Sequence, residues 1–127
     1  MPAYANSKGV RMSPRKVSEV AALIRGRTIA DAVTILDHTP RRAAGAVKGV
    51  VVSARANAEH NHNYKPDSLH IVEITVTAGP RLKRYRPAAR GRALPFARKT
   101  SHIKVTVDGE KRATKKKITE ATAKEEK

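Results

Sequence analysis

The segment from residue 79 to residue 101 constrains the fold most, because it is strongly basic and connects two predicted strands. Residues 69–77 are rich in β-branched side chains, and residues 102–107 alternate polar with apolar residues before an Asp-Gly turn. Both patterns predict strands. The connection between them is far longer than an ordinary hairpin loop. It also has too few large apolar residues to pack a core of its own.

The same segment carries three residues that break helices, Pro87, Gly91 and Pro95. It is therefore predicted to form a long β-hairpin arm with its turn between Pro87 and Arg92. A two-stranded arm is marginally stable alone in water, so we expect a partner that accepts positive charge on both of its faces to hold it. The alternative is a disordered basic linker, although a linker more often lies at a chain terminus.

Positive charge dominates the chain and is concentrated around this arm. The 27 Lys and Arg residues outnumber the 11 Asp and Glu residues, which gives a formal net charge of +16, and no acidic residue occurs from residue 74 to residue 107. A compact fold at this charge density repels itself unless an anionic partner surrounds it. Nucleic acid is the predicted partner.

A membrane is a less suitable anionic partner for this composition. Binding to a membrane surface favours a basic amphipathic helix with Trp, Phe or Leu on its apolar face, but Trp is absent and Phe occurs once. No stretch approaches the roughly 20 apolar residues of a membrane span. The first ten residues lack the apolar core of a secretory signal, so none is expected.

Arginine and aromatic side chains in the arm favour RNA. Six Arg accompany two Lys between Pro80 and Lys99, and the planar guanidinium both binds phosphate and stacks on bases. Two aromatic residues lie among these cations and are predicted to stack on unpaired bases. The candidate RNA-binding residues of the arm are Arg81, Lys83, Arg84, Tyr85, Arg86, Arg90, Arg92, Phe96, Arg98 and Lys99.

Apolar residues at helical spacing predict three helices before residue 70. Ser13-Pro14 starts the first helix and Gly26 ends it. Thr28 caps a short second helix, and Thr39-Pro40 starts a third that extends to about Asn61. Residues 4–12 are predicted to supply a third strand, so the fold class is α+β.

Two of these predicted helix starts are followed by pairs of cations, Arg15-Lys16 and Arg41-Arg42. The positive end of the helix dipole disfavours cations there. A phosphate group bound at the helix N-terminus would favour them, so all four residues are candidate RNA ligands. The alternative is that they are ordinary solvated charges.

Catalytic and metal-binding chemistry has little support in the sequence. Cys is absent, which excludes thiolate zinc sites and Cys nucleophiles. His60 and His62 lack the spacing of a helical zinc pair, and no third ligand is obvious. We predict no metal, cofactor or catalytic residue. A metal-dependent nuclease centred on these two His residues is the enzymatic alternative.

A DNA-compacting architectural protein, with a β arm in the minor groove, is the alternative from another class. Such a protein usually needs a dimer interface, and the sequence offers no spare apolar face for one. No homo-oligomer is therefore expected.

Six groups of residues are more informative together than separately. They are Ser13-Pro14-Arg15-Lys16-Val17, Leu23-Ile24-Arg25-Gly26, Ala54-Arg55-Ala56-Asn57-Ala58-Glu59-His60-Asn61, Gly79-Pro80 with Leu82-Lys83-Arg84, Pro87-Ala88-Ala89-Arg90-Gly91-Arg92-Ala93 and Arg98-Lys99-Thr100-Ser101-His102-Ile103. In this order, across residues 9–107, they resemble the bacterial large-subunit ribosomal protein family numbered twenty-two. Each group is a weak signal alone, but the combination is highly specific.

The resemblance implies three helices packed on a small three-stranded antiparallel sheet, with a long protruding β-hairpin arm. One domain is expected over residues 1–109, with the arm at about 79–101, followed by a charged, disordered tail over 110–127. In the family, such a protein is a structural part of the large subunit of the cytoplasmic ribosome. It binds several domains of 23S ribosomal RNA, supports early assembly and has other ribosomal proteins as neighbours.

The resemblance also assigns roles to particular positions. The arm of the family lines the nascent-peptide exit tunnel, and Arg25 joins the RNA-binding residues. The tip residues that would face a nascent polypeptide are Pro87, Ala88, Ala89, Arg90, Gly91 and Arg92. This chain departs from the family pattern at Ala88, where a basic residue is frequent, and in its longer, lysine-rich C-terminal tail.

Overall fold

Alternation of apolar and polar residues builds the main sheet. In β5 (Ser101–Asp108), Ile103, Val105 and Val107 are fully buried and the intervening side chains point away from the core. β5 is the central strand and pairs antiparallel with β1 (Ala3–Val10) and with β2 (His70–Ala78), which gives the order β1-β5-β2. This computed structural model describes residues 1–113.

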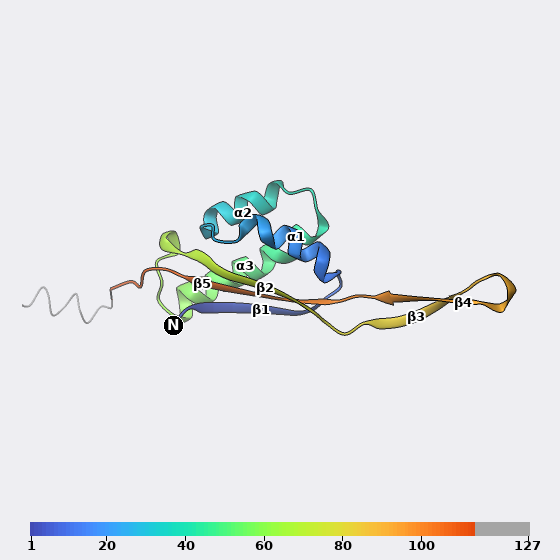
Figure 1. Ribbon diagram of the computed structural model, residues 1–127. Coiled ribbons are helices and arrows are strands. Elements are labelled where there is room, and N and C mark those ends of the chain that lie inside the picture. Colours follow the sequence, from blue (N-terminus) through green and yellow to red (C-terminus); the bar gives the residue numbers. More distant parts are fainter. Residues whose placement is uncertain (114–127) are drawn as a thin grey trace, which may run out of the picture.

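Three helices cover one face of this sheet (Figure 1). They are α1 (Pro14–Ile24), α2 (Ile29–His38) and α3 (Arg42–Asn61), with α3 packed on β1 and β5 and α1 packed on β2. The buried side chains are mostly Ala, Val, Ile and Leu, and Tyr64 is the one aromatic side chain among the buried residues of the described chain. The predicted α+β class, with three helices on a three-stranded antiparallel sheet, is confirmed.

Two of the three predicted helix starts are confirmed. Pro14 is the first residue of α1, and the Thr28 hydroxyl accepts a hydrogen bond from the Asp31 amide at 3.4 Å. The third start was wrong. The Thr39 hydroxyl donates to the Ile35 carbonyl at 2.7 Å and so closes α2, while α3 begins two residues after Pro40. The Thr39 hydroxyl bonds to the C-terminal end of α2, so it does not cap the N-terminus of α3.

The basic segment forms a β-hairpin, as predicted. β3 (Leu82–Pro87) and β4 (Ala93–Arg98) form their own two-stranded antiparallel sheet, which extends away from the helices and the main sheet (Figure 1). A single 3-10 turn (Ala89–Gly91) joins them. Arg90 and Gly91 both have positive φ, 61° and 70°, and the Ala88 amide donates to the Arg92 carbonyl at 2.7 Å. These features make the tip a tight turn.

The neck between the two sheets is fixed by close backbone contacts. The Gly79 amide donates to the Thr100 carbonyl at 2.8 Å, and the Thr100 hydroxyl donates to the Pro80 carbonyl at 2.6 Å. A Cβ atom on Gly79 would lie 2.5 Å from Thr100 Oγ1, so a larger residue here would displace this hydroxyl from its bond to Pro80. The arm therefore leaves the main sheet at a defined point.

The first residues after the last strand hydrogen-bond to the segment that follows α3. The Lys65 amide donates to the Glu110 carbonyl at 2.8 Å, and the Arg112 amide donates to the Asn63 carbonyl at 2.7 Å. The remainder of the tail predicted over 110–127, from residue 114 onward, lies outside the described residues. None of the helices in the described part is both long enough and apolar enough to cross a membrane.

Candidate nucleic-acid interface

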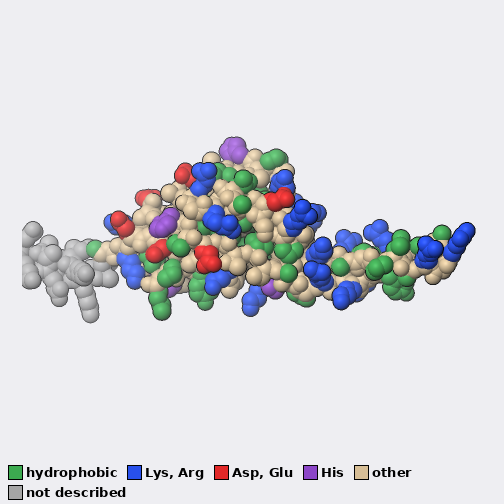
Figure 2. Space-filling model, viewed as in Figure 1, with side chains coloured by type: hydrophobic (Ala, Val, Ile, Leu, Met, Phe, Trp, Pro, Cys, Tyr) green, Lys and Arg blue, Asp and Glu red, His purple; other side chains and the backbone are tan. Residues whose placement is uncertain are grey.

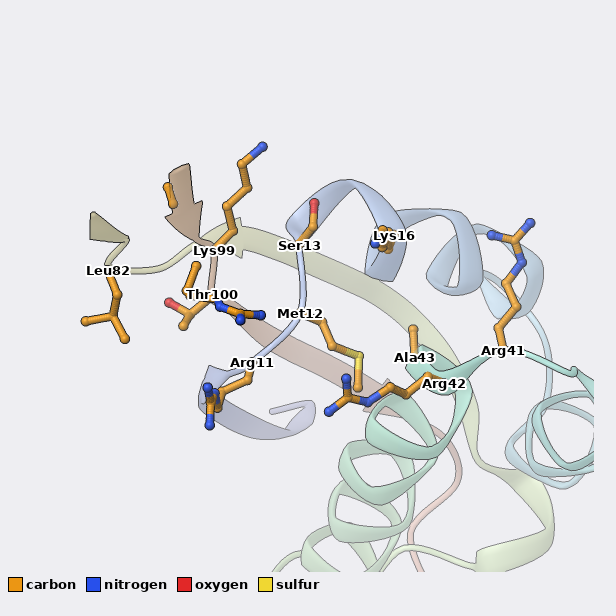
Figure 3. Close-up of a pocket in the computed structure, with 12 residues that line it drawn as sticks. Arg11, Met12, Ser13, Lys16, Arg41, Arg42, Ala43, Leu82, Lys99 and Thr100 are labelled. Atoms are coloured by element: carbon orange, nitrogen blue, oxygen red, sulfur yellow. The ribbon is translucent and has the colours of Figure 1, made fainter. Parts of the chain in front are cut away.

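A groove of about 990 Å³ lies where the arm meets the starts of α1 and α3 (Figure 3). Six of its lining residues are cationic, and the lining contains no acidic residue. They come from three parts of the chain: the loop after β1 and the first turn of α1, the start of α3, and the base of the arm. The lining residues are Arg11, Met12, Ser13, Lys16, Arg41, Arg42, Ala43, Leu82, Ala97, Arg98, Lys99 and Thr100.

The groove brings together residues that the sequence suggested for two separate reasons. Lys16, Arg41 and Arg42 were predicted from the helix starts, whereas Arg98 and Lys99 were predicted from the arm. Arg11 was missed, because its only signal is a position near the end of the predicted strand 4–12. Arg15 lies in the first turn of α1 but does not line the groove.

Two helix N-termini face the groove without side-chain caps. Within the described chain, α1 and α3 each have no side-chain hydrogen bond at the cap and no acidic residue in the first turn. Their first amide groups and the positive ends of their dipoles favour an anion at this position. Arg41 is partly balanced, since its guanidinium lies 2.6 Å from the Glu19 carboxylate. The five other cations of the groove form no ion pair with any described residue.

Strand register gives the arm two different faces. Directly paired residues lie on the same face of a hairpin. We call one the arginine face, and it consists of Leu82 paired with Arg98, Arg84 with Phe96, and Arg86 with Leu94. We call the other the tyrosine face, and it consists of Lys83 paired with Ala97, Tyr85 with Pro95, and Pro87 with Ala93. The arginine face carries three cations and the tyrosine face carries Lys83, so both faces are positively charged, though unequally.

The two aromatic residues of the arm lie on opposite faces and in different surroundings. The Arg86 guanidinium carbon lies 4.9 Å from the centre of the Phe96 ring, and that of Arg98 lies 6.0 Å from it. Cation–π attraction at these distances holds both guanidinium groups over the ring. Tyr85 is 70% exposed, and the residues opposite it on its face of β4 are Ala93, Pro95 and Ala97. Tyr85 is therefore the open ring, while Phe96 supports two arginines.

The remaining predicted cations are spread along the molecule. Arg25 donates to the Ile74 carbonyl at 3.2 Å and ties the end of α1 to β2. Arg81 precedes β3, and Arg90 and Arg92 lie at the exposed tip. In Figure 2 the arm carries Lys and Arg side chains and no Asp or Glu on the visible face.

The histidines considered for a metal site lie elsewhere. His60 is in the last turn of α3, and His62 follows it with its ring centre 6.3 Å from that of Tyr64. The described residues hold no group of three or more His, Cys, Asp or Glu side chains arranged for a metal ion.

Comparison with known proteins accounts for this combination of helices, sheet and arm. Residues 5–108 match the family described as ribosomal protein L22p/L17e. The chain belongs to this family. The large ribosomal subunit protein uL22 of Oceanobacillus iheyensis is 50% identical over 111 residues, which cover 87% of this chain and 98% of the relative. The protein of the same name from Clostridioides difficile is 45% identical over 111 residues, 87% of this chain and the whole of the relative.

Membership of the L22p/L17e family makes this a protein of the large ribosomal subunit, in a family of structural proteins rather than enzymes. The matched residues include both helix starts at the groove and the entire arm. The family resemblance noted in the sequence is confirmed.

Proposed function

We propose that this protein binds large-subunit ribosomal RNA through one continuous basic surface, formed by the groove and the arginine face of the arm. One observation carries the proposal. Arg98 belongs to both, since it lines the groove and lies on the arginine face beside Phe96. An RNA backbone can therefore pass from the helix starts onto the arm without crossing an acidic side chain.

The proposed mechanism is electrostatic anchoring combined with shape. The helix N-termini and the groove cations bind phosphate groups at the base of the arm. Along the arm, guanidinium groups neutralise the repulsion between RNA segments on the arginine face. On the other face, Tyr85 offers a flat ring to an unpaired base. The role is structural, with no reaction catalysed.

We place the tip of the arm beside the nascent-peptide exit tunnel on the strength of its motif. Residues 87–93 match the family pattern except at Ala88, and the tip turn is narrow because Arg90 and Gly91 are both left-handed. A photo-crosslinker at position 90, in ribosomes with a stalled nascent chain, should capture that chain. The same crosslinker at Lys48, on α3, should not. Equal capture at both positions would contradict the placement of the tip beside the tunnel.

We also propose that the protein acts early in assembly, and the same geometry supports this. An arm that lies between RNA segments on both faces is difficult to insert after those segments have packed together. The protein should therefore join the RNA before the surrounding structure closes, with other large-subunit proteins as later neighbours. No homo-oligomer is part of this arrangement.

A competition experiment tests the RNA proposal. The full chain should bind labelled large-subunit RNA, and unlabelled large-subunit RNA should compete better than small-subunit RNA. The groove variant R42Q/R98Q/K99Q should bind more weakly, whereas K48Q should match the unmodified protein because Lys48 is already paired with Asp37. Equal competition by both RNAs, with no effect of the groove variant, would contradict the proposal.

A further inference from the structure

The face of the main sheet that the helices leave uncovered is rich in polar side chains. All three helices lie on one side of β1, β5 and β2, as Figure 1 shows. The alternation that buries Ile103, Val105 and Val107 turns the intervening residues of β5 to the opposite side. These include His102 and Lys104. Nothing in the groove or the arm uses this face.

Strand register arranges these side chains in rows across the sheet. Lys104 pairs with Asn6 on β1 and with Thr75 on β2, which places the three side chains side by side. His102 pairs with Thr77 in the next row towards the arm. On the far side of Lys104, its ammonium nitrogen lies 5.1 Å from the centre of the Tyr4 ring, which holds the lysine over the sheet.

A hollow of about 230 Å³ lies among these rows. It contains two lysines and a histidine, and no acidic residue lines it. The Glu73 carboxylate accepts a hydrogen bond at 3.1 Å from the hydroxyl of Thr75, which lines the hollow, but Glu73 itself lies outside the lining. The lining residues are Asn6, Ser7, Lys8, Thr75, Thr77, His102, Ile103 and Lys104.

Hydrogen bonding fixes the chemistry of the histidine in this hollow. His102 Nδ1 accepts a hydrogen bond from the Gly9 amide at 3.0 Å. The neutral ring therefore carries its hydrogen on Nε2, so that this nitrogen is a donor. Lys8 and Lys104 supply further donors, and both are exposed. A set of donors without an acid is complementary to a phosphate oxygen.

We propose that this hollow binds a phosphate group of an RNA backbone, so that the open face of the sheet is a second RNA surface. The inference rests on the proposed RNA-binding function but uses residues that the groove and arm do not. The hollow lies at the arm end of the sheet, where a Cβ atom on Gly79 in the neck would lie 3.2 Å from His102 Cε1. Hydroxyl and amide groups of Thr77 and Asn6 are suited to ribose hydroxyls beside the phosphate.

The test compares two pairs of cations in the full chain. K8Q/K104Q changes the hollow, R98Q/K99Q changes the groove, and K48Q is the matched control on the helical side. The affinity of each for full-length large-subunit RNA is measured across a salt series. Each lost phosphate contact lowers the slope of log affinity against log salt by about 0.7 to 0.9. K8Q/K104Q should lose at least one contact while melting like the unmodified protein.

The outcomes separate this inference from the proposed function. If K8Q/K104Q retains the full slope and R98Q/K99Q does not, the hollow is not an RNA surface and the groove still is. If neither pair changes the slope, the proposed function fails as well. A lysine-acetylation measurement adds a direct readout, since RNA alone should protect Lys8 and Lys104 from the reagent. Protection only in the complete subunit would assign the hollow to a neighbouring protein and overturn the inference.

Discussion

The Arg86 guanidinium carbon lies 4.9 Å from the centre of the Phe96 ring, across the two strands of the arm. Arg98 approaches the same ring at 6.0 Å from the other direction along β4. A ring held between two arginines organises them for phosphate contacts on one face. Phe96 therefore supports two arginines, whereas Tyr85 on the other face is free to stack on a base.

Replacing Phe96 with Ala should weaken RNA binding by releasing both guanidinium groups. An exposed cation–π pair contributes about 0.5–1 kcal/mol, so the expected loss is about two- to fivefold in affinity at fixed salt. The control F96Y keeps an aromatic ring and should bind normally. Filter binding decides the matter, and a normal affinity for F96A would show that the arginines need no support from the ring.

Replacing Tyr85 with Ala should weaken binding in a different way. Stacking of an aromatic ring on a base contributes about 1–3 kcal/mol, and no charge is lost. The affinity should therefore fall while the slope against salt stays unchanged. The control Y85F retains the ring. A change in slope, or no change in affinity, would mean that Tyr85 does not stack on a base.

Deleting residues 82–96 should leave the rest of the chain folded. No residue in that span belongs to the buried core, whereas Ile103 on the central strand is fully buried. The deletion should still unfold cooperatively in a circular-dichroism melt. In contrast, I103A should cost about 2–5 kcal/mol in the free energy of unfolding. Loss of cooperative unfolding in the deletion would show that the arm supports the core.

Replacing Arg90 with Ala should reduce RNA contact with little effect on stability. Arg90 is exposed at the tip, so the change should lower the salt slope by about one phosphate contact, 0.7 to 0.9. R90K keeps the charge and should keep the slope. R90G relaxes the left-handed backbone at this position and should behave like R90A. If R90G differed from R90A, the backbone rather than the charge would be responsible.

Acid should destabilise the fold partly through Asp108. The Gly109 amide donates to this carboxylate at 2.9 Å, and that bond holds the pKa of Asp108 below its usual value. Because the pKa of Asp108 is lower in the folded state, its ionised carboxylate stabilises the fold. This contribution to the free energy of unfolding is complete at pH values above the usual Asp pKa of about 3.9. It is lost as the pH falls through the lowered pKa.

Urea denaturation of the unmodified protein and of D108N, across pH 3 to 6, checks this linkage. The unmodified protein should be the more stable at pH 6, and the difference should shrink as the pH falls. If the difference in the free energy of unfolding between the two proteins did not change with pH, Asp108 would not contribute to acid destabilisation.

Apolar periodicity was sufficient to predict most of the fold. Val, Ile and Ala recur at helical spacing in the helices, and apolar residues alternate with polar ones in the last strand. Both patterns are local and can be recognised in the sequence. The start of α3 was not predictable in the same way. Two helix ends lay within reach of the Thr39 hydroxyl, and tertiary structure decided that α2 receives it.

The candidate site was predictable as a set of residues but not as an arrangement. Arg98 and Lys16 are far apart in the sequence, and only the crossing at Gly79 and Thr100 brings the base of the arm to the helix starts. The division of the arm into two faces depends on strand register. A shift of one residue in that register would exchange the faces. The register is fixed by the geometry of the tip turn, which no short sequence motif predicts.

The measurement that tests the central claim most directly is the affinity for large-subunit RNA and for duplex DNA across a salt series, with the full chain and with the deletion of residues 82–96. We predict that the RNA binds more tightly than the DNA, and that the deletion lowers the RNA slope by several phosphate contacts. Equal affinity for the two nucleic acids, with a slope unchanged by the deletion, would contradict the account. The positive charge would then be a non-specific field, as expected of an architectural DNA-binding protein.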